Sequence, residues 1–371
     1  MNYFASLFLE YLKNKPAPIE KKPSKGLYLL IFAAGILIGV AAIYFSGNKK
    51  EPAPTVSTVK TVEQKPVSTF KKKRFTNPLA DSPEYHEYDI RPVSDLSSII
   101  QNRVDKQIAK GAANSISVYY RDLTNDQVIG INEKETFSPA SLLKVPLLIT
   151  VLKYAEQNPS TLKYPISYNL PSEQIYKAKG ISDKSALIQG RSYTVDQLLE
   201  IMVVASDNEA TILLLQFIDE VAPGFRHKVE TDLKLETPNN LNYTDDYITV
   251  RRYSFFFRTL FNASYLSPEM SEKALSVLAE TGYGNGIRQA IPTEIQVSQK
   301  YGHRKIDETH HQYHHFAIVY HPVKPFLIGI MTKGKSPESL QSVIAAIANT
   351  IYIEVNRQSN QKASYLSRDV D

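Results

Sequence analysis

The stretch Ser141-Leu142-Leu143-Lys144 decides the fold of this chain, and it opens an apolar run that continues through Leu147–Ile149. Residues three apart lie on the same face of a helix, so the Lys144 amine can sit beside the Ser141 hydroxyl. A serine hydroxyl becomes a good nucleophile when a neighbouring base takes its proton, and a desolvated lysine can be that base. The stretch therefore predicts a Ser–Lys pair near the start of a helix.

The residues around this pair fit a helix start. Ser138 can cap the helix, Pro139 suits its first turn, and the positive end of the helix dipole favours negative charge at Ser141. Pro146 lies inside the predicted helix and leaves the Leu142 carbonyl without its amide donor, which predicts a kink. Alone, the pair is also compatible with a solvated serine and a surface lysine on an amphipathic helix.

Two further motifs follow in order along the chain. Ser206-Asp207-Asn208 follows the apolar helix predicted over 194–205, and Lys300-Tyr301-Gly302 follows a strand-like segment over 294–298. The set S-x-x-K, S-D-N and K-T-G is the signature of class A β-lactamases and penicillin-binding proteins. Two of the three motifs are matched and the third differs at its middle residue, so the chain resembles this superfamily.

The resemblance extends beyond the motifs, from roughly residue 93 to residue 357. It includes the segments around the first two motifs and the two strands after the third, over residues 137–146, 193–200, 203–210, 316–320 and 326–331. It implies an α/β sandwich in which a five-stranded antiparallel sheet is flanked by terminal helices and a helical subdomain. The patterns predict helices over 93–110, 141–157, 194–205, 208–220, 253–260, 268–280 and 336–354, and strands over 115–121, 127–131, 294–301, 315–320 and 326–332. Residues 226–247 are polar and predict irregular structure.

The resemblance also implies a role for each motif residue. Ser141 would be the nucleophile, Lys144 its base, and Ser206 the relay of a proton to the leaving nitrogen. Asn208 would hold the substrate amide and orient Lys144, while Asp207 ties its loop together. Lys300 would bind the substrate carboxylate or lower the pKa of Lys144. The oxyanion hole would be the backbone N–H groups of Ser141 and of His303, which follows Gly302.

Two positions depart from the family pattern. Tyr301 stands where the family has Thr or Ser, and a phenol cannot occupy the place of the small hydroxyl that helps to hold the substrate carboxylate. Class A enzymes also carry a loop glutamate three residues before a Leu-Asn pair; here Leu241-Asn242 is the pair and Pro238 is at the glutamate position. Glu236 is the candidate deacylation base, with a surface loop acid as the alternative.

Six of the eight histidines fall between His303 and His321. His310/His314 and His311/His315 have the i,i+4 spacing that binds metal on a helix. The surrounding sequence instead predicts a loop that leads into a strand. There, side chains four residues apart do not point to one place, so the segment predicts a solvated polar hairpin. The sequence predicts neither a metal nor another cofactor.

Composition limits the class of protein. The 371 residues contain no Cys, which excludes disulfides, cysteine-ligated metal and a lipid anchor on cysteine. Residues 1–90 hold 13 Lys and Arg against 8 Asp and Glu, and the remaining residues hold 30 of each. Because the globular part is balanced, nothing marks it as a nucleic-acid binder. The oligomeric state stays open.

The N-terminal part predicts a membrane anchor. Leu27–Phe45 is almost wholly apolar and long enough for the ~30 Å hydrocarbon core. A cleaved signal peptide is the alternative, but Ile43-Tyr44-Phe45 lies where small residues would precede cleavage. More lysines lie before this stretch than soon after it, which favours an inside N-terminus. The prediction is a single-pass protein of the cell membrane with its catalytic domain outside the cytoplasm.

The chain then divides into a cytoplasmic N-terminus (1–25), the anchor (26–47), a disordered linker (48–90), the hydrolase domain (91–357) and a polar tail (358–371). Lys71-Lys72-Lys73-Arg74, within the linker, predicts a solvated charge run or a contact with anionic lipid or wall polymer. Residues 88–371 are expected to fold without the anchor.

Two functions compete. The first is a serine acyl-transfer enzyme that takes β-lactams or D-alanyl peptides of peptidoglycan through an acyl-enzyme on Ser141. The second is a non-catalytic, membrane-tethered module that binds wall peptide or senses β-lactams on the same fold. The intact motif residues favour the enzyme. Tyr301 and the missing loop glutamate leave the non-catalytic binding module as the alternative.

Overall fold

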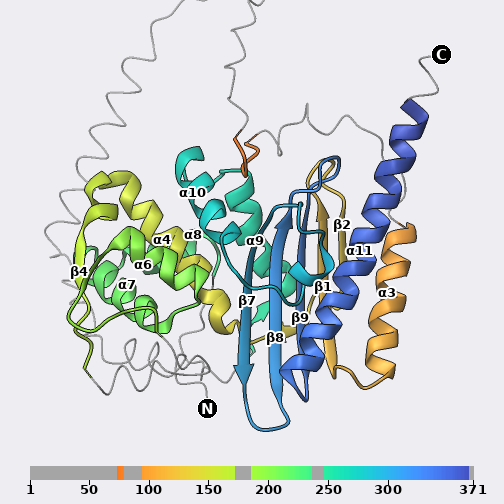
Figure 1. The fold of residues 1–371 in the computed structure, drawn as a ribbon, viewed down its shortest axis with the longest axis horizontal. Coiled ribbons are helices and arrows are strands. Elements are labelled where there is room, and N and C mark those ends of the chain that lie inside the picture. The colour runs from red at the N-terminus through yellow and green to blue at the C-terminus, as the bar shows by residue number, and fades with distance from the viewer. Residues whose placement is uncertain (1–72, 79–93, 172–184, 236–245, 367–371) are drawn as a thin grey trace, which may run out of the picture. The chain divides into compact units, whose positions relative to one another are not determined.

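The computed structural model describes residues 73–78, 94–171, 185–235 and 246–366 (Figure 1). The predicted anchor over Leu27–Phe45, Glu236 and most of the predicted linker lie outside these ranges. Across the described ranges, no helix combines the length and the apolar character needed to cross a membrane.

A five-stranded antiparallel sheet forms the centre of the domain, in the order β2-β1-β9-β8-β7, which confirms the predicted sheet. Its strands are β1 (Ser115–Asp122), β2 (Val128–Ile131), β7 (Val297–Lys305), β8 (His311–Val319) and β9 (Phe326–Gly334). Two short pairs lie outside the sheet: β3 (Thr136–Phe137) with β6 (Ile248–Thr249), and β4 (Pro165–Ser167) with β5 (Ser192–Thr194). β7 is therefore an edge strand of the main sheet.

The two terminal helices, α3 (Ser94–Ala109) and α11 (Pro337–Leu366), cover one face of the sheet (Figure 1). The Ser336 hydroxyl accepts the Ser339 amide at 3.2 Å, which confirms the predicted cap of α11. The predicted end near Glu354 is wrong, because the helix continues to Leu366, into the segment predicted as a polar tail. Val355 and Ser359 are buried, so tertiary packing extends the helix past its last strongly apolar turn.

The helical block covers the other face, as predicted (Figure 1). It comprises α4 (Lys144–Gln157), α6 (Val195–Val204), α7 (Asn208–Val221), α8 (Phe225–Asp232), α9 (Val250–Phe261) and α10 (Pro268–Ala279), with short 3₁₀ turns η2 (Ala140–Leu143), η3 (Pro159–Lys163) and η4 (Arg288–Ala290). Thr194 and Gln197 form the predicted capping box of α6. The prediction of irregular structure over 226–247 is wrong for α8. Buried Arg226 pairs there with Asp219 of α7 at 3.1 Å and with Glu230 at 3.0 Å, a tertiary network that apolar periodicity does not reveal.

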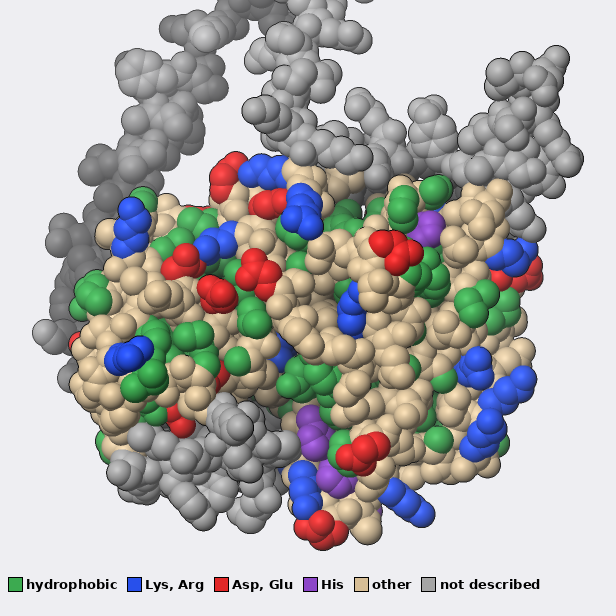
Figure 2. Space-filling model, viewed as in Figure 1, with side chains coloured by type: hydrophobic (Ala, Val, Ile, Leu, Met, Phe, Trp, Pro, Cys, Tyr) green, Lys and Arg blue, Asp and Glu red, His purple; other side chains and the backbone are tan. Residues whose placement is uncertain are grey.

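The predicted solvated histidine hairpin holds at the exposed turn that contains His310, but it is wrong beyond that turn, because β7 continues to Lys305 and β8 begins at His311. His311, His314 and His315 are buried in the sheet, and burial lowers the pKa of both His314 and His315 to about 3. Histidine side chains reach the surface near the turn that joins β7 and β8, where acidic and basic residues are interspersed (Figure 2). Among the described residues, no group of three or more His, Asp and Glu is placed to hold a metal ion.

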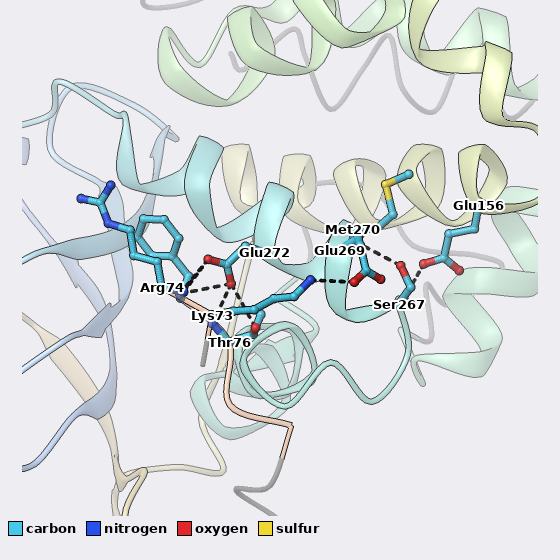
Figure 3. A network of polar contacts seen from close by, with 9 residues as sticks. Lys73, Arg74, Thr76, Glu156, Ser267, Glu269, Met270 and Glu272 are labelled. Atoms are coloured by element: carbon cyan, nitrogen blue, oxygen red, sulfur yellow. Dashed lines mark hydrogen bonds and ion pairs between the residues drawn. The ribbon is translucent and has the colours of Figure 1, made fainter. Parts of the chain in front are cut away.

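Part of the predicted linker packs on the domain instead of being disordered. Residues 73–77 form a strap along α10, held mainly by the Glu272 carboxylate (Figure 3). That carboxylate accepts the backbone amides of Arg74, Phe75 and Thr76 at 2.8–3.1 Å and the Thr76 hydroxyl at 3.0 Å. Phe75 is buried with its ring edge against Tyr320.

The basic cluster belongs partly to this strap. Lys73 pairs with Glu269 at 2.7 Å, and the Arg74 guanidinium donates to Gln296 at 2.9 Å and lies over the Phe75 ring. The Arg74 side chain stays exposed, as a solvated charge run predicts, while backbone amides and the Phe75 side chain bring the segment onto α10.

We expect a chain that begins at residue 88 to be less stable than one that begins at residue 73. Losing the strap exposes the surface that Phe75 buries and leaves Glu272 without its donors. Burial of a phenylalanine and a set of charge-assisted hydrogen bonds predicts a loss of about 2–4 kcal/mol. Urea unfolding of the chains that begin at residues 73 and 88 measures this difference in unfolding free energy. Equal midpoints would show that the strap contributes no stability.

Two glutamates of α10 provide a matched control for the strap. Glu272→Ala should destabilise the longer chain by about 2 kcal/mol, because three backbone amides lose their acceptor. Glu269→Ala removes a pair in which the carboxylate is 73% exposed and screened by solvent, so it should leave the urea midpoint close to that of wild type.

Candidate active site

Ser141 lies in the 3₁₀ turn η2, and α4 begins only at Lys144. Neither element has a side-chain cap, so the prediction that Ser138 caps the helix is wrong. Ala140, directly before the nucleophile candidate, has a φ of 49°. A non-glycine residue in this left-handed region is strained by about 1–3 kcal/mol, and such residues persist where surrounding contacts hold them.

Side chains of β8 hold the backbone before this turn. The Gln312 side-chain oxygen accepts the Ser138 amide at 3.0 Å, and His314 Nε2 donates to the Ser138 carbonyl at 2.9 Å. Both side chains lie on the same face of β8. Ser138 therefore contributes its backbone to the site, and sequence reasoning missed Gln312 and His314. Residues 311–316 read His-Gln-Tyr-His-His-Phe and show no polar–apolar alternation, so no local signal marked these two side chains.

Gly302 lets β7 approach the nucleophile turn closely. A Cβ at this position would lie 2.9 Å from the Pro139 carbonyl oxygen and 3.2 Å from the Leu142 nitrogen, both backbone atoms. Only glycine permits this approach without movement of the turn. The contact places the backbone of the K-x-G triplet beside the segment that carries Ser141.

Lys144 connects two of the motifs. Its Nζ lies 3.2 Å from Ser141 Oγ, 2.7 Å from Asn208 Oδ1, and 2.6 and 3.2 Å from the carbonyl and hydroxyl oxygens of Ser206. The side chain is fully buried. Burial lowers the pKa of Lys144 to about 7, although the negative charge of Asp207 opposes the change. A substantial fraction of this amine is therefore neutral near pH 7 and can accept a proton.

Lys300 brings the third motif to the same place. Its Nζ donates to Ser206 Oγ at 2.9 Å and to the Tyr301 carbonyl at 3.0 Å. Burial first, and the positive charge of Lys144 second, lower the pKa of Lys300 well below its ordinary value. The Ser206 hydroxyl thus lies between two buried lysines, at a residue whose φ of 54° is itself strained.

The S-D-N segment is fixed by the start of α7. Asp207 caps this helix by accepting the Ala210 amide at 2.8 Å, and its other carboxylate oxygen accepts from Ser185 and Ala186. Asp207 contacts loop and helix backbone here, as expected for a residue that ties its loop together. Asn208, the next residue, directs its side-chain oxygen to Lys144.

Tyr301 lies in an aromatic stack on the face of β7 that carries the terminal helices. Its ring centroid is 4.0 Å from that of Tyr283 and 6.0 Å from that of Tyr313, and the Lys300 ammonium lies 4.4 Å from the Tyr301 ring centroid. His303, on the same face, approaches His311 at 3.1 Å between ring nitrogens. Burial lowers the pKa of His303 to about 4.

The structure thus brings together the side chains of Ser141, Lys144, Ser206, Asn208 and Lys300, with Gly302 against the nucleophile turn. The Tyr301 ring turns into the aromatic stack, and the His303 side chain turns to His311. Glu236 and Pro238 lie outside the described residues. The chemistry available to the central group is proton transfer between a serine hydroxyl and a lysine held partly neutral by burial.

Comparison with known proteins agrees with this geometry. A sequence model described as "Beta-lactamase enzyme family" matches residues 96–355. No curated protein matches the chain.

Solved structures share the fold at low sequence identity. PBP-A is 18% identical with a TM-score of 0.58, the match covering 72% of this chain and 98% of PBP-A. A β-lactamase from Xanthomonas campestris is 17% identical with a TM-score of 0.56 (69% and 97% covered), and one from Sphaerobacter thermophilus is 19% identical with a TM-score of 0.56 (68% and 94% covered). The matched region spans the whole sheet and helical block, and the chain therefore belongs to the β-lactamase enzyme family of serine hydrolases.

Proposed function

We propose that this protein is an extracytoplasmic, membrane-anchored enzyme that forms an acyl-enzyme on Ser141 with β-lactams or D-alanyl peptides of peptidoglycan. The observation that carries the proposal is the position of Lys144 Nζ, buried and 3.2 Å from Ser141 Oγ, with its pKa lowered to about 7. A buried lysine tuned in this way is suited to a general base and is costly to keep for structure alone.

In the proposed acylation, neutral Lys144 takes the proton of Ser141 Oγ while that oxygen attacks the carbonyl carbon of the substrate amide. The backbone N–H groups of Ser141 and His303 stabilise the oxyanion. As the intermediate collapses, the C–N bond breaks and the leaving nitrogen receives a proton through the Ser206 hydroxyl. That hydroxyl lies 3.2 Å from Lys144 Nζ and 2.9 Å from Lys300 Nζ, so either amine can replace the proton.

Lys300 and Lys144 are coupled electrostatically. Two ammonium groups around one hydroxyl repel each other, and after burial the charge on Lys144 is the second cause that lowers the pKa of Lys300. Lys300 is also the cation available for a substrate carboxylate. The hydroxyl that the family's Thr or Ser supplies is replaced by a Tyr301 ring stacked on Tyr283. We infer that carboxylate recognition here lacks the hydroxyl of the family pattern, relies on Lys300 among the three motifs, and is weaker than in the family.

The acylation rate should rise with pH through about 7 and level off above it. The lysine must be neutral to accept the proton, and its folded-state pKa is about 7, so each unit below that value should cost about tenfold in rate. The initial rate of β-lactam adduct formation between pH 5 and 9 measures the profile. Because Lys144 and Lys300 interact, the apparent pKa belongs to the pair. A flat profile over this range would remove Lys144 as the base.

Labelling with a fluorescent penicillin tests the proposed function and separates it from a non-catalytic binding module. An acylating enzyme becomes covalently tagged and keeps the tag after denaturation, whereas a module loses it. A variant of PBP-A, one of the structures that share the fold, is described as an acyl-enzyme complex with penicillin G. That precedent supports the choice of probe.

The membrane anchor is part of the proposal and rests on the uncharged, apolar stretch Leu27–Phe45 with lysines before it. A reporter enzyme that is active only outside the cytoplasm should be active when fused after Asp371. Activity of a cytoplasm-specific reporter at the same position would reverse the topology.

A further inference from the structure

The Leu142 carbonyl of the nucleophile segment lacks the amide donor that a regular helix would give it, and within the segment it accepts the Lys144 amide. Pro146 lies in the first turn of α4, and its ring nitrogen carries no hydrogen. In a regular helix the amide of residue 146 would donate to the carbonyl of residue 142, four residues earlier. Leu142 is fully buried between Ser141 and Lys144 in the chain, so water cannot replace the missing amide.

Tyr253 supplies a donor from outside the segment. Its hydroxyl, on α9, donates to the Leu142 carbonyl at 2.8 Å. The Tyr253 side chain is fully buried, with its ring centroid 4.4 Å from that of Phe316 of β8 and 5.4 Å from that of Phe256. The ring therefore has no room to turn away, and the hydroxyl is fixed relative to both the sheet and α9.

We propose that Tyr253 is a positioning residue whose hydroxyl replaces the amide that Pro146 removes and so fixes the turn that holds Ser141 against Lys144. This inference rests on the proposed role of Ser141 as nucleophile. Pro146 and Tyr253 form a complementary pair: the proline removes a local donor, and the tyrosine supplies one anchored in the core.

The turn needs such a contact because its local support is weak. Neither η2 nor α4 has a side-chain cap, and Ala140 is held at a strained φ of 49°. Without Tyr253 the Leu142 carbonyl loses its donor from the core and keeps the Lys144 amide of its own turn, so the turn can relax. A shift of about 1 Å in a reacting group can cost roughly 100-fold in rate.

Four variants of the full-length chain test the proposal. Tyr253→Phe should slow acylation by a β-lactam at least about tenfold. Pro146→Ala restores an amide at position 146 and should leave the rate within about threefold of wild type. The double variant should regain most of the rate lost in Tyr253→Phe, because the new amide can donate to Leu142. Tyr320→Phe removes a hydroxyl that meets Ser298 Oγ at 3.2 Å on another part of β7, and should leave the rate within about twofold.

Two results would overturn the proposal: Tyr253→Phe acylates as fast as Tyr320→Phe, or the double variant is no faster than Tyr253→Phe. In the second case the slower acylation of Tyr253→Phe comes from altered packing and not from the lost hydrogen bond to the Leu142 carbonyl. Circular dichroism establishes that each variant is folded before rates are compared.

Hydrogen exchange separates this inference from the proposed function. Amide protection over residues 141–145 should fall in Tyr253→Phe and return in the double variant, whether or not the protein reacts with the probe. If the wild type is never acylated, the proposed function fails, and the exchange result alone decides the inference. Unchanged protection in Tyr253→Phe would overturn it.

Discussion

Ser141→Ala should abolish covalent labelling by a β-lactam while leaving the domain folded. The hydroxyl is the atom that would form the ester, and it lies 3.2 Å from the Lys144 amine that would take its proton. Loss of a nucleophile typically costs more than ~10³-fold in rate, because no other group forms the covalent bond. Lys144 keeps its contacts to Ser206 and Asn208 in this variant, so unfolding should shift by no more than about 1 kcal/mol.

Intact-mass measurement over time checks this expectation. Ser271→Ala is a matched control, since Ser271 is a buried serine of α10 whose hydroxyl has no hydrogen-bond partner among the described residues. It should be labelled at the wild-type rate. An adduct on the Ser141 variant that forms as fast as on wild type would assign the nucleophile to another residue.

Turnover should begin with a burst of acyl-enzyme and then stall. Acylation needs Ser141, a base and the oxyanion donors, and the first two are in place in the structure. Deacylation needs a positioned water and its own general base, which is typically worth 10²–10⁴-fold. At the family's position for that base the sequence has Pro238, which has no acid–base group. Penicillin should therefore act more as an inhibitor than as a substrate.

Glu236→Gln decides whether the loop supplies a substitute base. If Glu236 serves, the variant should hold its acyl-enzyme longer than wild type, while Glu220→Gln, an exposed glutamate of α7, should not. Rapid, repeated hydrolysis by both wild type and Glu236→Gln would show that the base lies elsewhere. A slow second phase that is the same in both would mean that Glu236 does not replace the family's glutamate.

Several features could be predicted from the sequence because they are local. Helix periodicity, the Thr194–Gln197 capping box and the strand-like segments of β1 and β9 depend on neighbours in the chain, and the structure confirms them. The spacing of Ser141 and Lys144 by three residues likewise fixed their proximity before any tertiary contact was known. Together with the S-D-N and K-x-G triplets, these features identified the fold.

Other features were decided by packing between distant segments. The α8 helix depends on a buried ion network with α7, the buried histidines of β8 depend on neighbouring strands, and the strap depends on Glu272, nearly 200 residues away. No local pattern records these contacts, since each side chain taken alone is polar and would favour water. The same holds for the chemistry of the site. The sequence contains a serine and two lysines, but it is burial in the folded core that lowers the pKa of Lys144 to about 7. Likewise, Tyr253 of a distant helix donates to the carbonyl that Pro146 deprives of its helical donor.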